Sequence, residues 1–236
     1  MAKRSVELGP GVFRIPTLGD YINSFAFVAD DGQVTLVDCG LKRAPAAIVR
    51  GLESIGKRPY DVTRIILTHA HSDHAGGAHR MVELTSAAGV DVHEDDIEFV
   101  RAGHNPPVDT SVTMGRLFER SPNGKFEPFE VSSVLHDGEV IAGDIAVMHT
   151  PGHTPGHISL LHKPSGVLIT GDAIFNMRHR MSWPLAVFCT SAALNQQSAQ
   201  ALADADYQVA AFTHGPEIRD NARESIRDFI RRKSKA

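Results

Sequence analysis

Apolar residues in the first half of the chain fall into short segments that turn residues separate. Some segments are about five residues long and rich in β-branched residues, which predicts strands, while others repeat apolar residues at helical spacing. The predicted strands are 11–15, 24–29, 33–38, 64–67 and 90–93, and the predicted helices are 43–55, 74–85 and 94–101. This half therefore begins with strands and brings in helices later.

The second half repeats that order. Its predicted strands are 131–135, 140–141, 145–149, 157–161, 167–170 and 208–212, and its predicted helices are 192–203 and 216–232. Ser191 can cap the first of these helices, and Pro216 fits the first turn of the second. Strands first and helices later, in each half, favour an α/β (α+β) protein with two packed sheets covered by helices over one parallel sheet.

Residues 103–129 interrupt the pattern with several prolines and little periodicity. We expect a long surface excursion that is partly helical around 112–118. Long irregular loops in compact domains often act as lids or binding loops, so 103–129 is predicted to be a lid or a homodimer contact. No linker divides the chain, and residues 1–236 are predicted to form a single domain.

Composition narrows the classes of function. Of the 236 residues, 42% are hydrophobic and 22% are charged, as is typical of a soluble globular protein with one sizeable core. The net charge is −4 and the pI is about 6.3, whereas a nucleic-acid-binding domain usually has a pI above ~9. The basic cluster at 231–235 is expected to be a solvated terminus. We therefore expect a small-molecule substrate and no nucleic-acid partner.

Location is predicted from cysteine usage and apolar runs. Cys39 and Cys189 are isolated thiols and do not suggest a disulfide framework. Residues 1–15 lack the continuous apolar stretch of a signal peptide. No apolar run approaches the ~20 residues that cross a bilayer. We expect a reduced, cytoplasmic protein without a membrane partner.

The chain contains 13 histidines, and their positions carry the chemistry. Four apolar predicted strands end in threonine, and residues suited to metal binding follow each of them. These are His69-Ala70-His71-Ser72-Asp73-His74 after Thr68, His153 after Thr150, Asp172 after Thr170, and His214 after Thr213. If the strand ends lie along one edge of the core, their loops converge there.

The segment 69–74 is the densest of these groups. His69 and His71 are two residues apart, so extended backbone directs both side chains to the same side. Asp73 and His74 follow where the chain turns toward a helix, so their side chains are expected to point in another direction. Two pairs with different directions suit two adjacent ions rather than one. A single histidine at a strand end is usually an ordinary polar turn residue, but this density predicts metal binding. Imidazole and carboxylate suit zinc, and also iron, manganese or nickel.

Two further polar residues leave alternatives open. Asp38 follows a predicted strand in Val37-Asp38-Cys39, and is either an ordinary turn aspartate or a group that orients the ligand loop. His157 is either a strand histidine bonded to backbone or a residue that supports the metal ligands from behind.

At these residues the chain resembles the metallo-β-lactamase-fold superfamily, from about Val12 to the last helix. The superfamily's five signature segments appear in order, at Asp38, 69–74, His153, Asp172 and His214. The resemblance implies a four-layer αβ/βα sandwich with two divalent metal ions at one edge, zinc first and iron or manganese as alternatives. It assigns one ion to His69, His71 and His153, the other to Asp73, His74 and His214, with Asp172 and a water or hydroxide as bridge. Asp38 is then a structural support.

The resemblance also indicates which branches of the superfamily this chain is similar to. True β-lactamases of the superfamily usually carry cysteine or serine where this chain has Asp172. A bridging aspartate is similar to glyoxalase II-type thioesterases, acyl-homoserine lactonases and phosphodiesterases. Glyoxalase II proteins carry a helical extension, whereas about one helix follows His214 here. The lactonases often place a tyrosine where this chain has Phe175, which cannot donate a hydrogen bond.

The predicted function is hydrolysis of an ester, lactone or thioester. Two cations ~3.5–4 Å apart can share and deprotonate a water that attacks the carbonyl carbon. Asp73 and Asp172 are the predicted catalytic residues, Asp73 because it can orient the nucleophile and carry a proton. Alternatives are β-lactam hydrolysis, phosphodiester hydrolysis, and a single-iron persulfide dioxygenase.

Candidate substrate contacts come from an apolar-rich stretch after Asp172 and from one N-terminal tyrosine. The candidates are Tyr21, Phe175, Met177, His179, Met181 and Trp183. Core packing is the alternative for the apolar members. Arg178 or Arg180 either meets an anionic substrate or lies on the surface.

Overall fold

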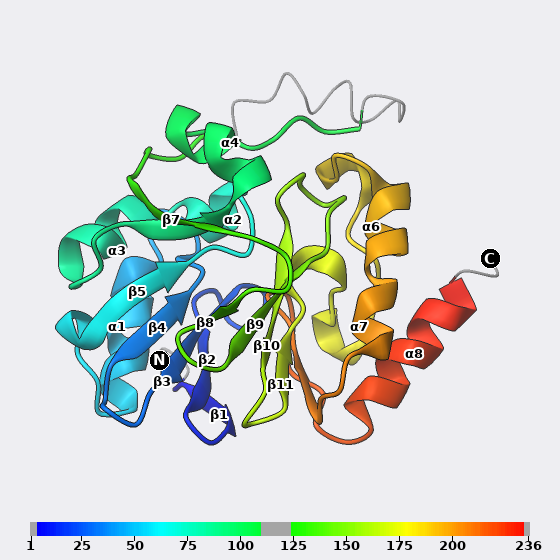
Figure 1. The fold of residues 1–236 in the computed structure, drawn as a ribbon, viewed down its shortest axis with the longest axis horizontal. Coiled ribbons are helices and arrows are strands. Elements are labelled where there is room, and N and C mark those ends of the chain that lie inside the picture. Colours follow the sequence, from blue (N-terminus) through cyan, green and yellow to red (C-terminus); the bar gives the residue numbers. More distant parts are fainter. Residues whose placement is uncertain (1–3, 110–123, 234–236) are drawn as a thin grey trace.

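Two β-sheets stand face to face in the centre of the molecule, and helices cover the outer face of each (Figure 1). This computed structural model describes residues 4–109 and 124–233. Its mixed α/β sandwich confirms the predicted fold class. Within the described ranges, no helix is long and apolar enough to cross a membrane.

The first sheet has seven strands in sequence order. They are β1 (Val6–Gly9), β2 (Val12–Pro16), β3 (Asn23–Val28), β4 (Val34–Val37), β5 (Val62–Ile66), β6 (Val90–His93) and β7 (Val131–Leu135). β1 to β4 pair antiparallel, whereas β4 to β7 pair parallel. Parallel neighbours need crossovers. Helical segments lie on them, namely α1 (Pro45–Ser54), η1 (Pro59–Asp61), α2 (Ser72–Ala75), α3 (Ala78–Leu84), η2 (Glu94–Asp96) and α4 (Ile97–Ala102).

The second sheet comes from the second half of the chain. Its order is β12 (Val209–Ala211), β11 (Val167–Ile169), β10 (Ile158–His162), β9 (Ile145–His149) and β8 (Val140–Ile141). Only the β11–β12 pair among these is parallel. Its helical segments are η4 (Gly171–Ala173), η5 (Met177–His179), η6 (Ala186–Phe188), α6 (Ala192–Ser198), α7 (Gln200–Asp204) and α8 (Ala222–Lys233).

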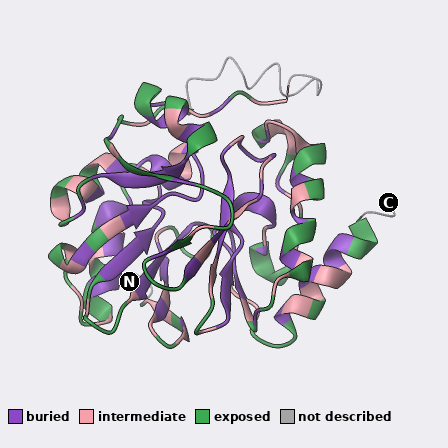
Figure 2. Ribbon diagram, viewed as in Figure 1, coloured by how far each residue is buried: buried purple, intermediate pink, exposed green. Residues whose placement is uncertain are grey.

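Buried apolar side chains form three clusters, one for each space between layers. Figure 2 shows that the central strands are mostly buried, whereas the helices alternate buried and exposed residues. Ile48 and Leu52 of α1 fill the space outside the first sheet. Phe25 lies between the two sheets, and Phe212 and Phe229 lie between the second sheet and its helices. Both strand faces are covered, which explains the nearly continuous apolar runs of the central strands.

The predicted helix at 74–85 is two helices, α2 and α3, with Gly76 and Gly77 between them. A Cβ on Gly77 would stand 2.3 Å from the carbonyl oxygen of Cys39, too close for any other residue. The backbone N–H of Gly77 also donates to the carbonyl of Gly40 at 3.0 Å. The glycine pair therefore lets the turn after β4 pack against the 69–74 segment.

Two C-terminal helix predictions need correction. The helix predicted at 192–203 is two helices, α6 and α7, which meet at Ala199, although Ser191 caps α6 as expected. The helix predicted at 216–232 begins only at Ala222. Ile218 exchanges two backbone hydrogen bonds with Ala210 of β12, so this segment is held extended beside the sheet edge.

The ends of the 103–129 excursion lie side by side. His104 and Lys125 form an isolated antiparallel bridge, and the N–H of Phe126 donates to the carbonyl of Gly103. The helix predicted around 112–118 falls outside the described residues. A role for 103–129 as lid or homodimer contact stays a prediction.

Candidate metal centre

The seven side chains of the expected ligand set meet where strands of both sheets end. The segment after β5 brings His69, His71, Asp73 and His74 from the first sheet. The segments after β9, β11 and β12 bring the other three from the second sheet, namely His153, Asp172 and His214. The predicted convergence of these loops is therefore present in the structure.

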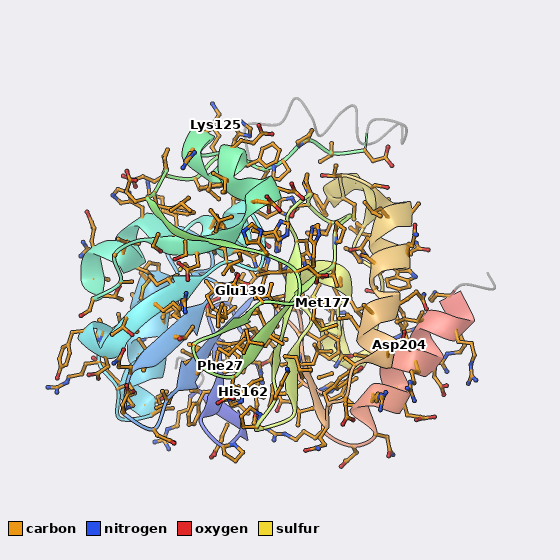
Figure 3. All side chains as sticks on the ribbon, viewed as in Figure 1. Phe27, Lys125, Glu139, His162, Met177 and Asp204 are labelled. Atoms are coloured by element: carbon orange, nitrogen blue, oxygen red, sulfur yellow. The ribbon has the colours of Figure 1, made fainter. Side chains whose placement is uncertain are left out.

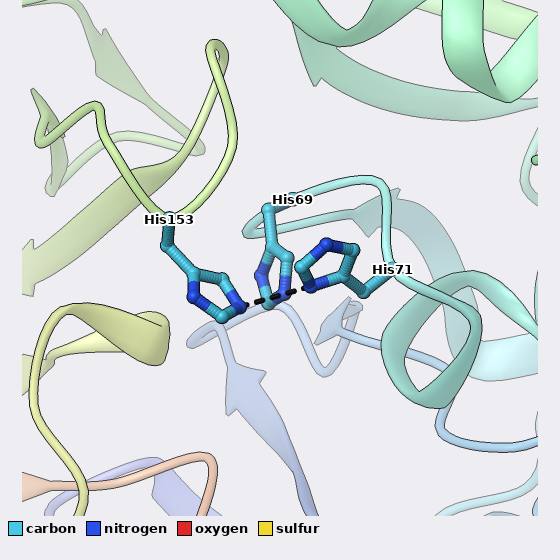
Figure 4. Close-up of side chains that lie close together, drawn as sticks. All are labelled: His69, His71 and His153. Carbon is cyan, nitrogen blue, oxygen red and sulfur yellow. Dashed lines mark hydrogen bonds between the residues drawn. The ribbon is translucent and has the colours of Figure 1, made fainter. Parts of the chain in front are cut away.

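His69, His71 and His153 form the first cluster (Figure 4). Nδ1 of His71 lies 2.9 Å from Nε2 of His153. Nε2 of His69 is buried and finds no hydrogen-bonding partner among the described residues. A buried nitrogen without a partner costs free energy, and three ring nitrogens aimed at one point suit a cation.

Asp73, His74 and His214 form the second cluster, and Asp172 lies between the two. Nε2 of His74 and Nε2 of His214 are 3.3 Å apart. Oδ2 of Asp172 lies 3.1 Å from Nε2 of His153 and 3.2 Å from Nε2 of His214. One carboxylate therefore borders both clusters, as expected of a bridging ligand.

Asp38 fixes the orientation of one histidine in each cluster. Its Oδ2 accepts from Nδ1 of His74 at 2.9 Å and from Oγ1 of Thr68 at 2.8 Å. Because that hydroxyl donates to Asp38, it accepts from Nδ1 of His69 at 3.0 Å. Nε2 of both histidines is thus left facing the centre. Asp38 is buried and adopts a left-handed φ of 59° at the end of β4, a conformation that aspartate tolerates.

His157 is buried behind the centre and supports Asp172. Its Nδ1 donates to the carbonyl of Thr150 at 2.8 Å, and its Nε2 accepts from the backbone N–H of Asp172 at 2.7 Å. Burial, with the neighbouring His153, lowers the pKa of His157 to about 3, so the ring is neutral and keeps this pattern. His157 therefore holds the backbone of Asp172 and not a cation.

Asp96 is a positioning residue that the sequence did not indicate. It is buried, and its Oδ2 accepts from the N–H of Ala70 and from Oγ1 of Thr154, each at 2.8 Å. Its Oδ1 accepts from the N–H of Gly156 at 2.7 Å. Ala70 separates two of the histidines of the first cluster, and Thr154 follows the third. Asp96 therefore ties together the two loops that carry this cluster.

The charges of the centre suit a cation. Burial lowers the pKa of His69 and of His71 well below the usual range, so both rings are neutral. Burial would raise the pKa of Asp172, but the imidazoles of His214 and His74 hold it well below its ordinary value. His69 and His71 therefore offer neutral imidazoles beside an ionised carboxylate, the donors that divalent transition metals take in proteins. The pKa values of His74 and His214 are raised instead, so these two rings must lose a proton before they bind a cation.

The sequence and the fold both match a known family. The family model described as the metallo-beta-lactamase superfamily matches residues 18–231. The chain belongs to this superfamily. The protein YobT of Bacillus subtilis (strain 168) is 31% identical over 222 residues, which cover 88% of this chain and 89% of that protein.

A second relative and a solved structure support the same family assignment. The human acyl-coenzyme A thioesterase MBLAC2 is 32% identical over 189 residues, which cover 72% of this chain and 66% of that protein. The metallo-beta-lactamase family protein TTHA1429 from Thermus thermophilus has a TM-score of 0.73 and 27% identity, and the match covers 97% of this chain and 81% of that chain. These matches confirm the metallo-beta-lactamase fold, and the family supports a metal-dependent hydrolase.

In this member of the metallo-beta-lactamase superfamily, a cavity of about 830 Å³ opens over the centre. Its floor is formed by histidines and carboxylates of both clusters, among them His71, Asp73, His153, Asp172 and His214. One wall is apolar and consists of Phe175, Met177, Trp183, Leu185, Val187 and Phe188. The described ends of the 103–129 excursion supply the other wall, which includes His104 and Lys125. Lys125 and Met177, both labelled in Figure 3, belong to these two walls.

The candidate substrate contacts divide into two groups. Phe175, Met177 and Trp183 line the cavity, whereas Tyr21, His179 and Met181 lie outside its lining. Met181 packs against the core outside the second sheet. The backbone carbonyl of Tyr21 accepts from Nδ1 of His214 at 2.6 Å, and its side chain lies near the guanidinium of Arg178. His179 is exposed.

Metal affinity is expected to rise between pH 7 and about pH 9. Burial opposes protonation of His74, but the carboxylates of Asp172 and Asp73 raise its pKa to about 9. The same two carboxylates hold the pKa of His214 well above its usual range, against the effect of burial. A cation must therefore displace a proton from each of these histidines at neutral pH, and each proton costs up to about tenfold in affinity per pH unit below the pKa of its group. Zinc binding measured against a chelator from pH 6.5 to 9.5 would show the rise.

The proton on His74 lowers metal affinity but stabilises the metal-free protein. Because the folded-state pKa of His74 is raised, its protonation stabilises the metal-free protein below about pH 6.5 and is lost as pH rises through 9. In Asp38→Asn, which removes one carboxylate that raises the pKa of His74, the rise in affinity should level off at a lower pH. Chelator-corrected affinity that stays flat in both proteins would contradict a protonated His74.

Proposed function

We propose that this protein hydrolyses acyl thioesters that carry a sizeable apolar acyl group, with two divalent metal ions as cofactors. The observation that carries the proposal is the apolar cavity directly above the paired clusters, with Phe175 over them. The name of the human relative, an acyl-coenzyme A thioesterase, supports the substrate class.

The residues present fit two cations. His69, His71 and His153 would hold one, Asp73, His74 and His214 the other, and Asp172 would border both. When bound, the cations would polarise the substrate carbonyl and lower the pKa of water. Zinc is the metal that we propose, with iron or manganese as alternatives that the same ligands accept.

The protein's own residues prepare this site. Asp38 and Thr68 direct Nε2 of two histidines toward the centre. Asp73 borders the cavity, and its Oδ2 lies 3.4 Å from Nε2 of His214. The side chain of Asp73 keeps 32% of its surface exposed, and the imidazoles of His74 and His214 hold the pKa of this carboxyl well below its usual range, so an ionised oxygen faces the substrate side.

Phe175 favours a thioester over an ester or lactone. Its ring lies with its centroid 4.5 Å from that of His214 and 6.5 Å from that of His153, where it covers the centre without offering a proton. A thiolate, whose conjugate thiol has a pKa of ~8.5, leaves without protonation much more readily than an alkoxide. The apolar wall binds the acyl group through burial, which stabilises by ~0.8 kcal/mol per CH₂ group.

Metal analysis with a hydrolysis screen tests the proposal. The screen compares octanoyl-coenzyme A, S-lactoylglutathione, an acyl-homoserine lactone, a chromogenic cephalosporin and bis-p-nitrophenyl phosphate. Two metals per chain and a clear preference for the octanoyl thioester are expected. A preference for another compound would reassign the substrate, and one iron per chain with oxygen uptake on glutathione persulfide would replace the hydrolase by an oxidoreductase.

Phe175→Tyr is expected to shift the preference toward oxygen esters. The new hydroxyl would stand over the centre and could protonate a departing alkoxide, whereas a thiolate gains little from it. We expect the ratio of ester to thioester turnover to rise on the order of 10-fold, below the 10²–10⁴-fold of an optimised acid–base group.

The matched control is Phe188→Tyr, which adds the same hydroxyl to the wall of the cavity. Steady-state kinetics with octanoyl-coenzyme A and p-nitrophenyl octanoate measure the ratio. Equal ratios in both variants would show that Phe175 does not decide which leaving group is accepted.

A further inference from the structure

A second group of imidazole and carboxylate side chains lies outside the cavity lining. His93 ends β6, Asp95 follows in the turn η2, and His149 ends β9 of the other sheet. One ligand atom from each lies within 4.8 Å of the others. We propose that His93, Asp95 and His149 form an additional binding site for a transition-metal cation.

The geometry brings three donors to one place. Oδ2 of Asp95 lies 3.7 Å from Nδ1 of His93 and 3.8 Å from Nε2 of His149. The two rings stack with centroids 3.9 Å apart and planes 18° apart, so these nitrogens lie on the same side of the stack. His93 is buried while Asp95 is exposed, so a cation can enter from solvent and keep water on its outer side.

Binding requires small changes that limit its strength. Nε2 of His149 donates to the carbonyl of Pro155 at 2.9 Å, and Nδ1 of His93 accepts from the N–H of Asp95 at 3.3 Å. Both bonds must yield, the proton of His149 must move from Nε2 to Nδ1, and each ring must tilt so that its lone pair meets the cation. With three protein ligands and these costs, the site binds more weakly than the centre below the cavity.

The charges around the site favour a divalent cation. Burial and the neighbouring His149 lower the pKa of His93, which leaves a neutral ring with no proton to displace. The carboxylates of Asp95 and Glu94 provide two negative charges, and His136 lies 3.3 Å from Glu94. Two imidazoles and one carboxylate select zinc, nickel, cobalt or copper over magnesium and calcium.

Equilibrium dialysis against graded zinc, followed by elemental analysis, tests the site in the whole protein. Over part of the zinc range, wild type should bind one more zinc ion per chain than Asp95→Asn does. This difference does not depend on how many zinc ions both proteins bind at the metal centre below the cavity. Asp95 is exposed, and its carboxylate faces the two histidines rather than a backbone donor, so this variant should fold normally. His149→Gln should remove the same equivalent.

Asp144→Asn is the matched control. Asp144 is exposed, and its carboxylate interacts electrostatically with one histidine, His162. This variant should bind zinc as wild type does. The same dialysis with magnesium should show no difference between wild type and Asp95→Asn. Identical zinc isotherms for wild type, Asp95→Asn and His149→Gln would overturn the proposal, and loss in Asp144→Asn alone would do so as well. None of these outcomes depends on the catalytic activity.

Discussion

Asp172→Asn is expected to lower kcat/KM by more than about 100-fold and to reduce the bound metal. The substitution keeps the shape of the side chain but removes the negative charge that borders both clusters. Residues that only support metal ligands typically change affinity or activity by ~10–100-fold, and a shared ligand should exceed that range. Steady-state kinetics and elemental analysis of the purified variant measure both effects.

Asp144→Asn again serves as control, because it removes an exposed carboxylate that lies outside the cavity lining. Circular dichroism should show that both variants are folded. Activity of Asp172→Asn within a few-fold of wild type, at full metal content, would mean that Asp172 is not a ligand.

Asp96→Asn is expected to weaken metal binding by about 10–100-fold, although Asp96 is not one of the seven side chains of the ligand set. An amide cannot accept from all three donors that the carboxylate holds, namely Ala70, Thr154 and Gly156. At least one buried donor loses its partner, which costs ~1–3 kcal/mol in the free energy of unfolding. Asp96→Ala leaves all three unpaired and should cost more.

Glu98→Gln is the matched control, since Glu98 is exposed on α4 close to Asp96 in sequence. Chelator competition gives the affinity, and the visible spectrum of the cobalt-substituted protein reports the geometry of the ligands. A changed spectrum in Asp96→Asn but not in Glu98→Gln would show a positioning role. An unchanged spectrum and affinity, with only a lower melting temperature, would limit Asp96 to stability.

The sequence predicted the central strands and the convergence of the candidate ligands well because both have strong local patterns. β5, β9 and β11 are rich in β-branched residues, and a threonine follows each of them within two residues. β1 went unpredicted, since Val6–Gly9 is short and partly exposed, and it is defined by its pairing with β2. An edge strand of this kind depends on a partner that periodicity does not reveal.

Long-range contacts explain what the sequence could not show at the site. Asp96 lies in the acidic run Glu94-Asp95-Asp96, and only the folded chain separates one buried carboxylate from its two exposed neighbours. Leu185, Val187 and Phe188 reach the cavity from the single-turn helix η6 and the residue before it, a segment too short for a period to indicate a face. The seven ligand positions were predicted from local pattern and resemblance, and their function as ligands stays a prediction for metal analysis to test.

The division of the ligand set between the two sheets has a consequence for the order of events during synthesis. Four of the side chains follow β5, and the others appear only after β9, β11 and β12. A nascent chain that ends before His214 can offer only part of the set, so full metal loading has to come after the two sheets have docked. Metal that binds only the docked state then stabilises the contact between the two halves. Each site adds about 4.1 kcal/mol to the free energy of unfolding at a free metal concentration roughly 1,000 times its Kd. In metal-starved cells, the last step of maturation should therefore be slow, because the two sheets have docked but the metal ions have not yet bound.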